Sequence, residues 1–248
     1  SGIHVALSAE QIGTLWGMPI TNTLLMSWVV VVLLSLLAFF VGRKPKLIPG
    51  KVQLVLEEII DGAHSFMRST LENDTVARRY LPLLLTLFLF IATANMLEFT
   101  PGIGSIQIYH DGELVPLLRS MNTDLNVTLA LAVIAVIAIE IAGVVTLGFF
   151  KYAGKFINFS SPLNFVVGII ELVSEISRLV SYSFRLFGNI FAGEVLIGVV
   201  AFFVPYILPS GLMAFELFIG ILQGAVFALL TLFFIKMAIM DTHEAEAH

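Results

Sequence analysis

The segment spanning residues 163–204 constrains this chain most, because it is a long apolar run that nevertheless carries charged side chains. No proline interrupts it, and its charged residues are Glu171, Glu175, Arg178, Arg185 and Glu194. A charged side chain at the centre of a bilayer costs about 2.5–3.5 kcal/mol on insertion scales, so facing all of these toward lipid would oppose insertion by roughly 15 kcal/mol. We therefore expect these side chains to face protein or water.

The polar residues of this run are spaced so that most of them share one helix face. At about 100° per residue they fall within a sector of roughly 120°, whereas Glu194 points away from it. Glu175 can pair with Arg178 at i,i+3, and it repels Glu171 at i,i+4 if both are ionised. Arg185 has no carboxylate within one turn of its own helix, and its guanidinium group stays protonated under ordinary conditions. This polar stripe consists of Glu171, Glu175, Arg178, Ser181, Arg185 and Asn189.

The composition is that of a polytopic membrane protein. Hydrophobic residues make up 58% of the 248 residues and charged residues only 12%, which is far from the average of soluble domains. The net charge of −5 argues against a nucleic-acid partner. The chain has no cysteine, so disulfides and thiolate metal sites are excluded. We expect one membrane domain over residues 1–248 without a cofactor, and His243 and His248 are expected to lie in a frayed polar tail and not in a metal site.

Five apolar segments are long enough to cross a membrane, so an all-α fold is expected. Residues 52–71 are predicted to form an additional amphipathic helix, because apolar residues recur there at i, i+3, i+4 and i+7. A helix over all of 163–204 would be about 63 Å long, roughly twice the hydrocarbon thickness. It must therefore break, with Gly188 as the candidate position, or tilt steeply. The expected membrane helices are 24–41, 81–99, 125–149, 163–204 and 212–240.

The basic residues predict the orientation of these helices, since positive charge collects in cytoplasmic loops. Lys151 and Lys155 mark one cytoplasmic loop, and Arg119 is the only basic residue of the loops expected outside. Residues 1–23 are then outside and residues 241–248 form a cytoplasmic tail. The other cytoplasmic basic residues are Arg43, Lys44, Lys46, Lys51, Arg68, Arg78 and Arg79.

This orientation sorts the polar residues of the membrane into two clusters with Arg185 between them. Two offset polar wells separated by a fixed cation would prevent an ion from crossing directly. An ion could cross only on a mobile carboxylate. The cytoplasmic cluster contains Glu171, Ser174, Glu175, Arg178 and Ser181, and the outer cluster contains Asn95, Glu98, Asn189, Glu194, Glu216 and Gln223.

Several motifs of the chain resemble those of the a subunit of F-type ATP synthases. The most specific is SYSFRLFGNIFAGE at residues 181–194, with Glu171 fourteen residues before Arg185. NTDLNVTLAL at residues 122–131, ANMLE at residues 94–98, and Glu216 followed seven residues later by Gln223 extend the similarity. The resemblance covers most of the chain and is weakest in the first fifty residues.

This resemblance implies the role of a non-catalytic stator subunit that conducts protons through two half-channels to and from the carboxylates of a rotating c-ring. Arg185 would be the essential charge separator, and the last two helices would be long and strongly tilted. The implied partners are the c subunits, the peripheral-stalk b subunits, the rest of the ATP synthase and the lipid bilayer. The implied location is the bacterial inner membrane, with the thylakoid membrane as the second choice. Glu194 and Glu216 are both acids here, whereas family members often have a histidine in this pair, so the proton-relaying residue of the two stays open.

Two other interpretations are compatible with the residues alone. The charges could be structural ion pairs in a helical bundle, because Glu175 and Arg178 can satisfy each other. The chain could also be an ion-coupled secondary transporter, in which acids near the membrane centre couple two ions or an ion and a solute. No inverted repeat is visible, and the two halves of the chain differ strongly in polar content.

Overall fold

The computed structural model of the chain describes residues 9–15, 17–43, 50–100, 106–110, 113–156 and 161–240. Within these residues, five helices are long and apolar enough to cross a membrane. The chain is therefore an all-α polytopic membrane protein, as predicted. The five helices are α1 (Asn22–Gly42), α3 (Asp74–Glu98), α4 (Leu125–Leu147), α6 (Pro162–Phe203) and α7 (Ile207–Ile239).

Side chains that cap the first turn explain where α1, α3 and α6 begin. Such a cap accepts a hydrogen bond from a backbone N–H group that has no partner within the helix. Thr21 accepts from the Leu24 N–H at 3.2 Å, and Asn73 accepts from the Thr75 N–H at 3.0 Å. At the start of α6, Ser161 accepts from the Asn164 N–H at 3.2 Å, and Pro162 occupies the first helical position. Polar residues that flank the apolar runs thus mark the N-terminal ends of these three helices.

Two helices begin earlier than the sequence analysis predicted, and both contain a proline there. Helix α3 begins at Asp74 and not at residue 81, and it continues through Pro82. Helix α7 begins at Ile207 and not at residue 212. Pro209 lies in its first turn, where the missing N–H group would have had no helical partner. The connection between α6 and α7 is therefore limited to residues 204–206.

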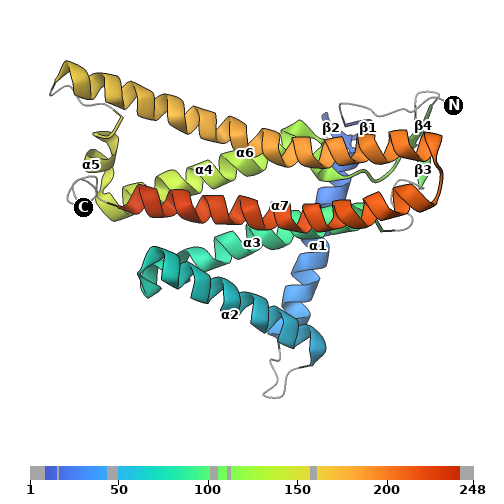
Figure 1. Cartoon of the computed structure of the whole chain (residues 1–248), viewed down its shortest axis with the longest axis horizontal. Helices are drawn as coiled ribbons and strands as arrows, with labels where there is room; N and C mark the ends of the chain where they lie inside the picture. Colours follow the sequence, from blue (N-terminus) through green and yellow to red (C-terminus); the bar gives the residue numbers. More distant parts are fainter. Residues whose placement is uncertain are drawn as a thin grey trace.

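The segment predicted as one helix over 125–149 is divided in two. Helix α4 ends at Leu147, and the short helix α5 (Phe149–Ala153) follows. Gly148 lies between them with a φ angle of +84°, a backbone conformation that glycine adopts without steric penalty. The chain therefore changes direction at Gly148, and α5 lies between the end of α4 and the start of α6 (Figure 1).

Helix α2 (Lys51–Leu71) is the predicted amphipathic helix, and it lies obliquely beside the bundle (Figure 1). Met67 and Leu71 are buried and belong to an apolar cluster with Leu84 of α3 and Leu232 of α7. Nearer its N-terminal end, Val52 and Val55 are exposed. One end of α2 is thus fixed to the bundle, and its exposed apolar residues suit an interfacial helix.

Helices α6 and α7 form the longest layer of the structure. They lie side by side where the chain turns from one to the other, and they diverge toward the opposite end, where α4 packs beside both of them (Figure 1). Helix α1 runs at a steep angle to this pair in the same view. Helix α6 is continuous from Pro162 to Phe203, so it does not break at Gly188. Of the two alternatives for this long segment, the structure therefore supports a steep tilt.

Two short hairpins, which the sequence analysis did not predict, lie at one end of the bundle. Strands β1 (Gln11–Leu15) and β2 (Met18–Thr21) form the first hairpin, and β3 (Gln107–His110) and β4 (Glu113–Pro116) form the second. The turn between α6 and α7 lies at the same end (Figure 1). We call this the hairpin end, and we call the opposite end, which contains α5, the α5 end.

Buried hydrogen bonds hold α1 and the start of α4 together at the hairpin end. The Thr23 hydroxyl donates to Asp124 Oδ2 at 2.9 Å, and Asp124 Oδ1 accepts from the Asn126 N–H at 2.9 Å. Asp124 therefore caps α4 and fixes α1 with one side chain. The short 3₁₀ helix η1 (Met121–Thr123) lies directly before it, and its residues are buried. These contacts place Asn122 inside the bundle.

Candidate functional site

The residues of the polar stripe on α6 form three groups, which differ in the elements that they contact. The group near the α5 end contacts residues that follow α5. The group near the hairpin end contacts α7 and the segment before α4. Arg185 lies between these two groups, and among the described residues its guanidinium Nη2 donates only to the Ser181 hydroxyl of its own helix, at 3.2 Å. The structure therefore keeps the two polar clusters of the sequence analysis apart.

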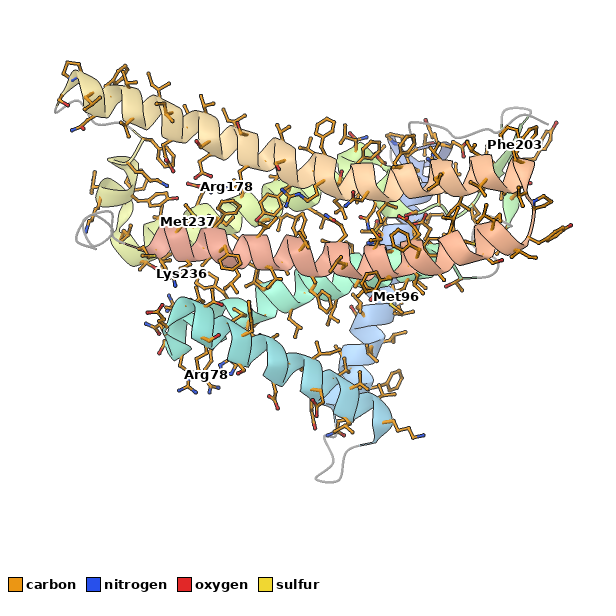
Figure 2. The ribbon with its side chains drawn as sticks, viewed as in Figure 1. Arg78, Met96, Arg178, Phe203, Lys236 and Met237 are labelled. Carbon is orange, nitrogen blue, oxygen red and sulfur yellow. The ribbon has the colours of Figure 1, made fainter. Side chains whose placement is uncertain are left out.

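At the α5 end, Glu175 and Arg178 form the ion pair that their i,i+3 spacing predicted. Arg178 Nη1 donates to both carboxylate oxygens of Glu175, at 2.9 and 2.6 Å. The two side chains are only 9% and 10% exposed, respectively. The guanidinium group also lies 3.8 Å from the ring centre of Phe234 in α7. Figure 2 shows Arg178 on the side of α6 that faces the other helices, so this cation is enclosed by protein.

Lys155, which the sequence analysis used only as a marker of orientation, belongs to the same cluster. Its Nζ lies 2.5 Å from Glu171 Oε1 and 3.9 Å from Glu175 Oε1. The lysine thereby reduces the repulsion expected between the two acids. Ser174 does not join the cluster, because its hydroxyl is exposed and donates to the Ile170 carbonyl oxygen at 2.9 Å.

Asn95 is the centre of the cluster at the hairpin end. Its Nδ2 donates to the Gly220 carbonyl oxygen at 2.8 Å, and its Oδ1 accepts from Asn122 Nδ2 at 2.6 Å. All three residues are buried. Nearer to Arg185, Asn189 Nδ2 donates to Gln223 Oε1 at 2.7 Å. Amide groups from α3, α6, α7 and η1 thus form a polar path through the apolar core.

The three acids of the hairpin-end cluster differ in their partners. Glu194 Oε2 lies 3.5 Å from Nη2 of Arg119, a buried residue. Glu216 packs against Gly193, and its Oε1 atom is buried without a hydrogen bond to any described residue. Glu98 Oε2 is buried in the same way, and both Glu194 and Glu216 act on it electrostatically. Glu194 therefore has a counter-ion, whereas Glu216 forms no ion pair within the described part of the chain.

Several partners in these clusters were not among the predicted site residues. Arg119 was noted only as a basic loop residue, and Asn122 only within a motif. Glu140 of α4 and Tyr152 of α5 lie near Glu175 and were also missed. Each belongs to a different element from its partner, so helical spacing could not have paired them. The available signal was a lone acid, Glu140, within an otherwise apolar helix.

The surface around Arg185 remains open in the isolated chain. Ser181, Arg185 and Asn189 are exposed along one side of α6, and so are the neighbouring apolar residues Val180 and Phe184. A guanidinium group between apolar side chains needs an anion or water in a membrane. Within the described residues, its guanidinium group forms a hydrogen bond only with Ser181 and no ion pair with a carboxylate. The arrangement therefore leaves a cation accessible on the surface of α6.

Comparisons with known proteins place these residues in a family context. A sequence model described as ATP synthase A chain matches residues 24–236. The chain is 32% identical to ATP synthase subunit a of Moorella thermoacetica over 217 residues, which are 88% of this chain and 90% of that protein. It is 33% identical to ATP synthase subunit a of Mycobacterium bovis over 243 residues, which are 95% and 94% of the two chains.

Two glycines of α6 provide a matched test of the hairpin-end packing. A Cβ atom at Gly193 would collide with the Glu216 carboxyl group, whereas a Cβ atom at Gly188 meets no described atom within 4 Å. Both replacements by alanine gain about the same helix propensity, up to ~1 kcal/mol. We expect Gly188→Ala to raise the thermal unfolding midpoint of the detergent-purified protein more than Gly193→Ala does, because only the second change requires the Glu216 carboxyl group to move. Equal midpoints for the two variants would contradict the close approach of Glu216 to α6.

Proposed function

The chain belongs to the ATP synthase A chain family, and on this premise we propose that its two polar clusters are the half-channels through which protons reach and leave a rotating c-ring. As a subunit a, it is a membrane component of ATP synthase. The α5-end cluster would open to one side of the membrane and the hairpin-end cluster to the other. The observation that carries this proposal is the position of Arg185, exposed between the two clusters without a carboxylate partner among the described residues.

Arg185 would act as the charge separator by electrostatics. A proton that reached the guanidinium group would meet a permanent positive charge in a medium of low dielectric constant, where repulsion is strong. A carboxylate on a c subunit would instead be attracted to it. That carboxylate would gain a proton from one cluster, pass through lipid in its neutral form, and lose the proton to the other cluster. The net result is rotation of the ring and no direct leak.

The residues of each half-channel supply oxygen and nitrogen atoms along this path. On the hairpin-end side, Glu98, Glu194 and Glu216 would exchange protons, while Asn95, Asn189 and Gln223 would order water and side chains between them. Glu216 is the better relay candidate of its pair, because Glu194 already faces Arg119. On the α5-end side, Glu171 and Glu175 would exchange protons beside Lys155 and Arg178, and Ser174 and Ser181 would line the approach. No bond of ATP is made in this subunit.

We further propose that the α5 end faces the cytoplasm of a bacterial cell. Arg78 and Lys236 lie toward this end (Figure 2), and Lys151 and Lys155 lie on the segment around α5. Positive side chains collect on the cytoplasmic side of membrane proteins. The N-terminal hairpin would then be outside. The exposed apolar residues of α6 would face the c-ring, and the peripheral-stalk b subunits would hold the chain in place.

The role of Arg185 can be tested with lysine, which keeps the charge but loses the planar group that binds a carboxylate through two hydrogen bonds. We expect Arg185→Lys to reduce ATP-driven proton pumping in inverted membrane vesicles by roughly tenfold or more, since hydrogen bonds to charged groups are worth about 1.5–3 kcal/mol. Arg68→Lys is the control, because Arg68 is exposed on α2, 3.9 Å from its nearest carboxylate oxygen. Normal coupled pumping by the Arg185→Lys variant would contradict the proposal.

The orientation can be tested with single cysteines, since the chain has none of its own. Glu171 and Glu194 are matched positions on α6, with side chains 30% and 34% exposed. We expect a membrane-impermeant thiol reagent to label Glu171→Cys from the cytoplasmic side and Glu194→Cys from the outer side of the assembled enzyme. Labelling of Glu171→Cys from the outer side alone would reverse the proposed topology.

A further inference from the structure

The α5-end cluster contains more negative than positive groups. Glu171 and Glu175 of α6 lie beside Lys155 and Arg178, and each cation contacts a carboxylate. Glu140 of α4 adds a third carboxyl group, which acts electrostatically on Glu175. Among the side chains described at this cluster, three carboxyl groups thus face two cations, an excess of one acid. Since an uncompensated charge is strongly disfavoured in a buried site, the cluster is set to take up one positive charge.

The position of Tyr152 indicates where the cluster would hold this positive charge. Its side chain is only 4% exposed, and its hydroxyl group forms no hydrogen bond of acceptable geometry with any described residue. The hydroxyl group lies beside Glu140, whose Oε1 atom is also buried without such a hydrogen bond. The ring packs directly on Gly143 of α4, where a Cβ atom would collide with it. The close approach of α5 to α4 therefore aims the hydroxyl group at the acids.

The hydroxyl group can act only as a donor or a neutral acceptor. Burial, followed by the neighbouring Glu140 carboxyl group, raises the pKa of Tyr152 above its ordinary value of 10.0. Tyr152 therefore keeps its proton at every physiological pH. A buried phenol that faces a carboxyl group normally donates a hydrogen bond to it. The unused hydrogen-bonding capacity at this point is thus on Oε1 of Glu140.

We propose that Glu140, Tyr152 and Glu175 form a proton-binding site between α4, α5 and α6, which holds one proton at the inner end of the cytoplasmic half-channel. The inference deepens the function proposed above and rests on it for the direction of proton flow. The proton is shared between the carboxyl groups of Glu140 and Glu175, and the Tyr152 hydroxyl group donates to Glu140. Lys155, Glu171 and Arg178 are the other charged groups that face this site. Binding one proton brings the cluster to neutrality.

The surroundings favour a proton over a metal cation. Both oxygen atoms of Glu175 already accept hydrogen bonds from Arg178. Hard cations need several oxygen ligands, six or more for Ca²⁺, and no group of three or more acidic or histidine side chains within the described residues is arranged to hold a metal ion. The Lys155 ammonium group would also repel a metal cation. A proton needs only one oxygen atom and one acceptor, which Glu140 and Glu175 supply.

The position of the site suits a reservoir within the half-channel. The Glu171 side chain is 30% exposed, whereas the Glu175 side chain is 9% exposed. A proton that enters from water at Glu171 would therefore move toward the more enclosed acids. The bound proton would then lie between α4 and α6, on the α5 side of Arg185, ready for transfer to a c-ring carboxylate.

Infrared difference spectroscopy on the purified enzyme in lipid vesicles tests the site. When the pH is lowered, we expect a carbonyl band from a protonated carboxylic acid that is lost in Glu140→Gln and shifted in Tyr152→Phe, which lacks the donor. Glu58→Gln is the matched control, because Glu58 is exposed on α2, and its spectrum should equal that of the wild type. A Glu140→Gln spectrum without that loss would overturn the proposal. So would removal of the band at constant pH by sodium chloride but not by choline chloride, because the site would then take a metal cation.

The experiments distinguish a failure of the proposed proton site from a failure of the half-channel proposal. The band reports proton binding in the resting enzyme, so it does not depend on rotation. If Arg185→Lys pumped normally while Glu140→Gln lost the band, the half-channel proposal would fail and the proton site would stand. If Arg185→Lys abolished pumping and both the Glu140→Gln and Tyr152→Phe spectra matched the wild type, only the proton site would be refuted. Tyr152→Phe keeps the ring packed on Gly143, so it tests the site even if Glu140→Gln does not assemble.

Discussion

The free-energy cost of an unpaired charge in a membrane governs the arrangement of this structure. Arg178 is enclosed and binds Glu175 through two hydrogen bonds, Lys155 contacts Glu171, and Glu194 lies beside Arg119. Each pair reduces the penalty of placing its members among apolar helices. Arg185 has no such partner within the described residues, although it lies on the same stripe. The exception matters because Arg178, the other basic residue of α6, is already paired with Glu175.

Close packing between helices brings the polar groups to their partners. Gly193 allows the Glu216 carboxyl group to lie against α6, Gly220 allows Asn95 to lie against α7, and Gly143 allows Tyr152 to lie against α4. A side chain at any of these positions would push the polar group away. The two polar clusters therefore depend on small residues that carry no chemistry themselves. Stability and function are coupled here, since a larger residue at any of these glycines would also displace Glu216, Asn95 or Tyr152.

The sequence predicted the parts of this site that are local. The stripe on α6 and the Glu175–Arg178 pair follow from helical periodicity, and the apolar runs revealed the five membrane helices. The partners that come from other elements were not predictable in this way, as the 75 positions between Arg119 and Glu194 illustrate. The early starts of α3 and α7, which lie outside the predicted apolar spans, were missed, and a proline lies near each start, Pro82 and Pro209 respectively. In the structure, one lies within a helix and the other in a first turn.

The central claim is that Arg185 serves a carboxylate from another subunit. The most direct measurement is an electron cryo-microscopy structure of the assembled ATP synthase in lipid, at a resolution that places side chains. We expect the Arg185 guanidinium group to face the c-ring, with a c-subunit carboxylate oxygen within about 4 Å at one rotational position, the range of an ion pair. A guanidinium group that pairs with a carboxylate of its own chain at every rotational position would contradict this account.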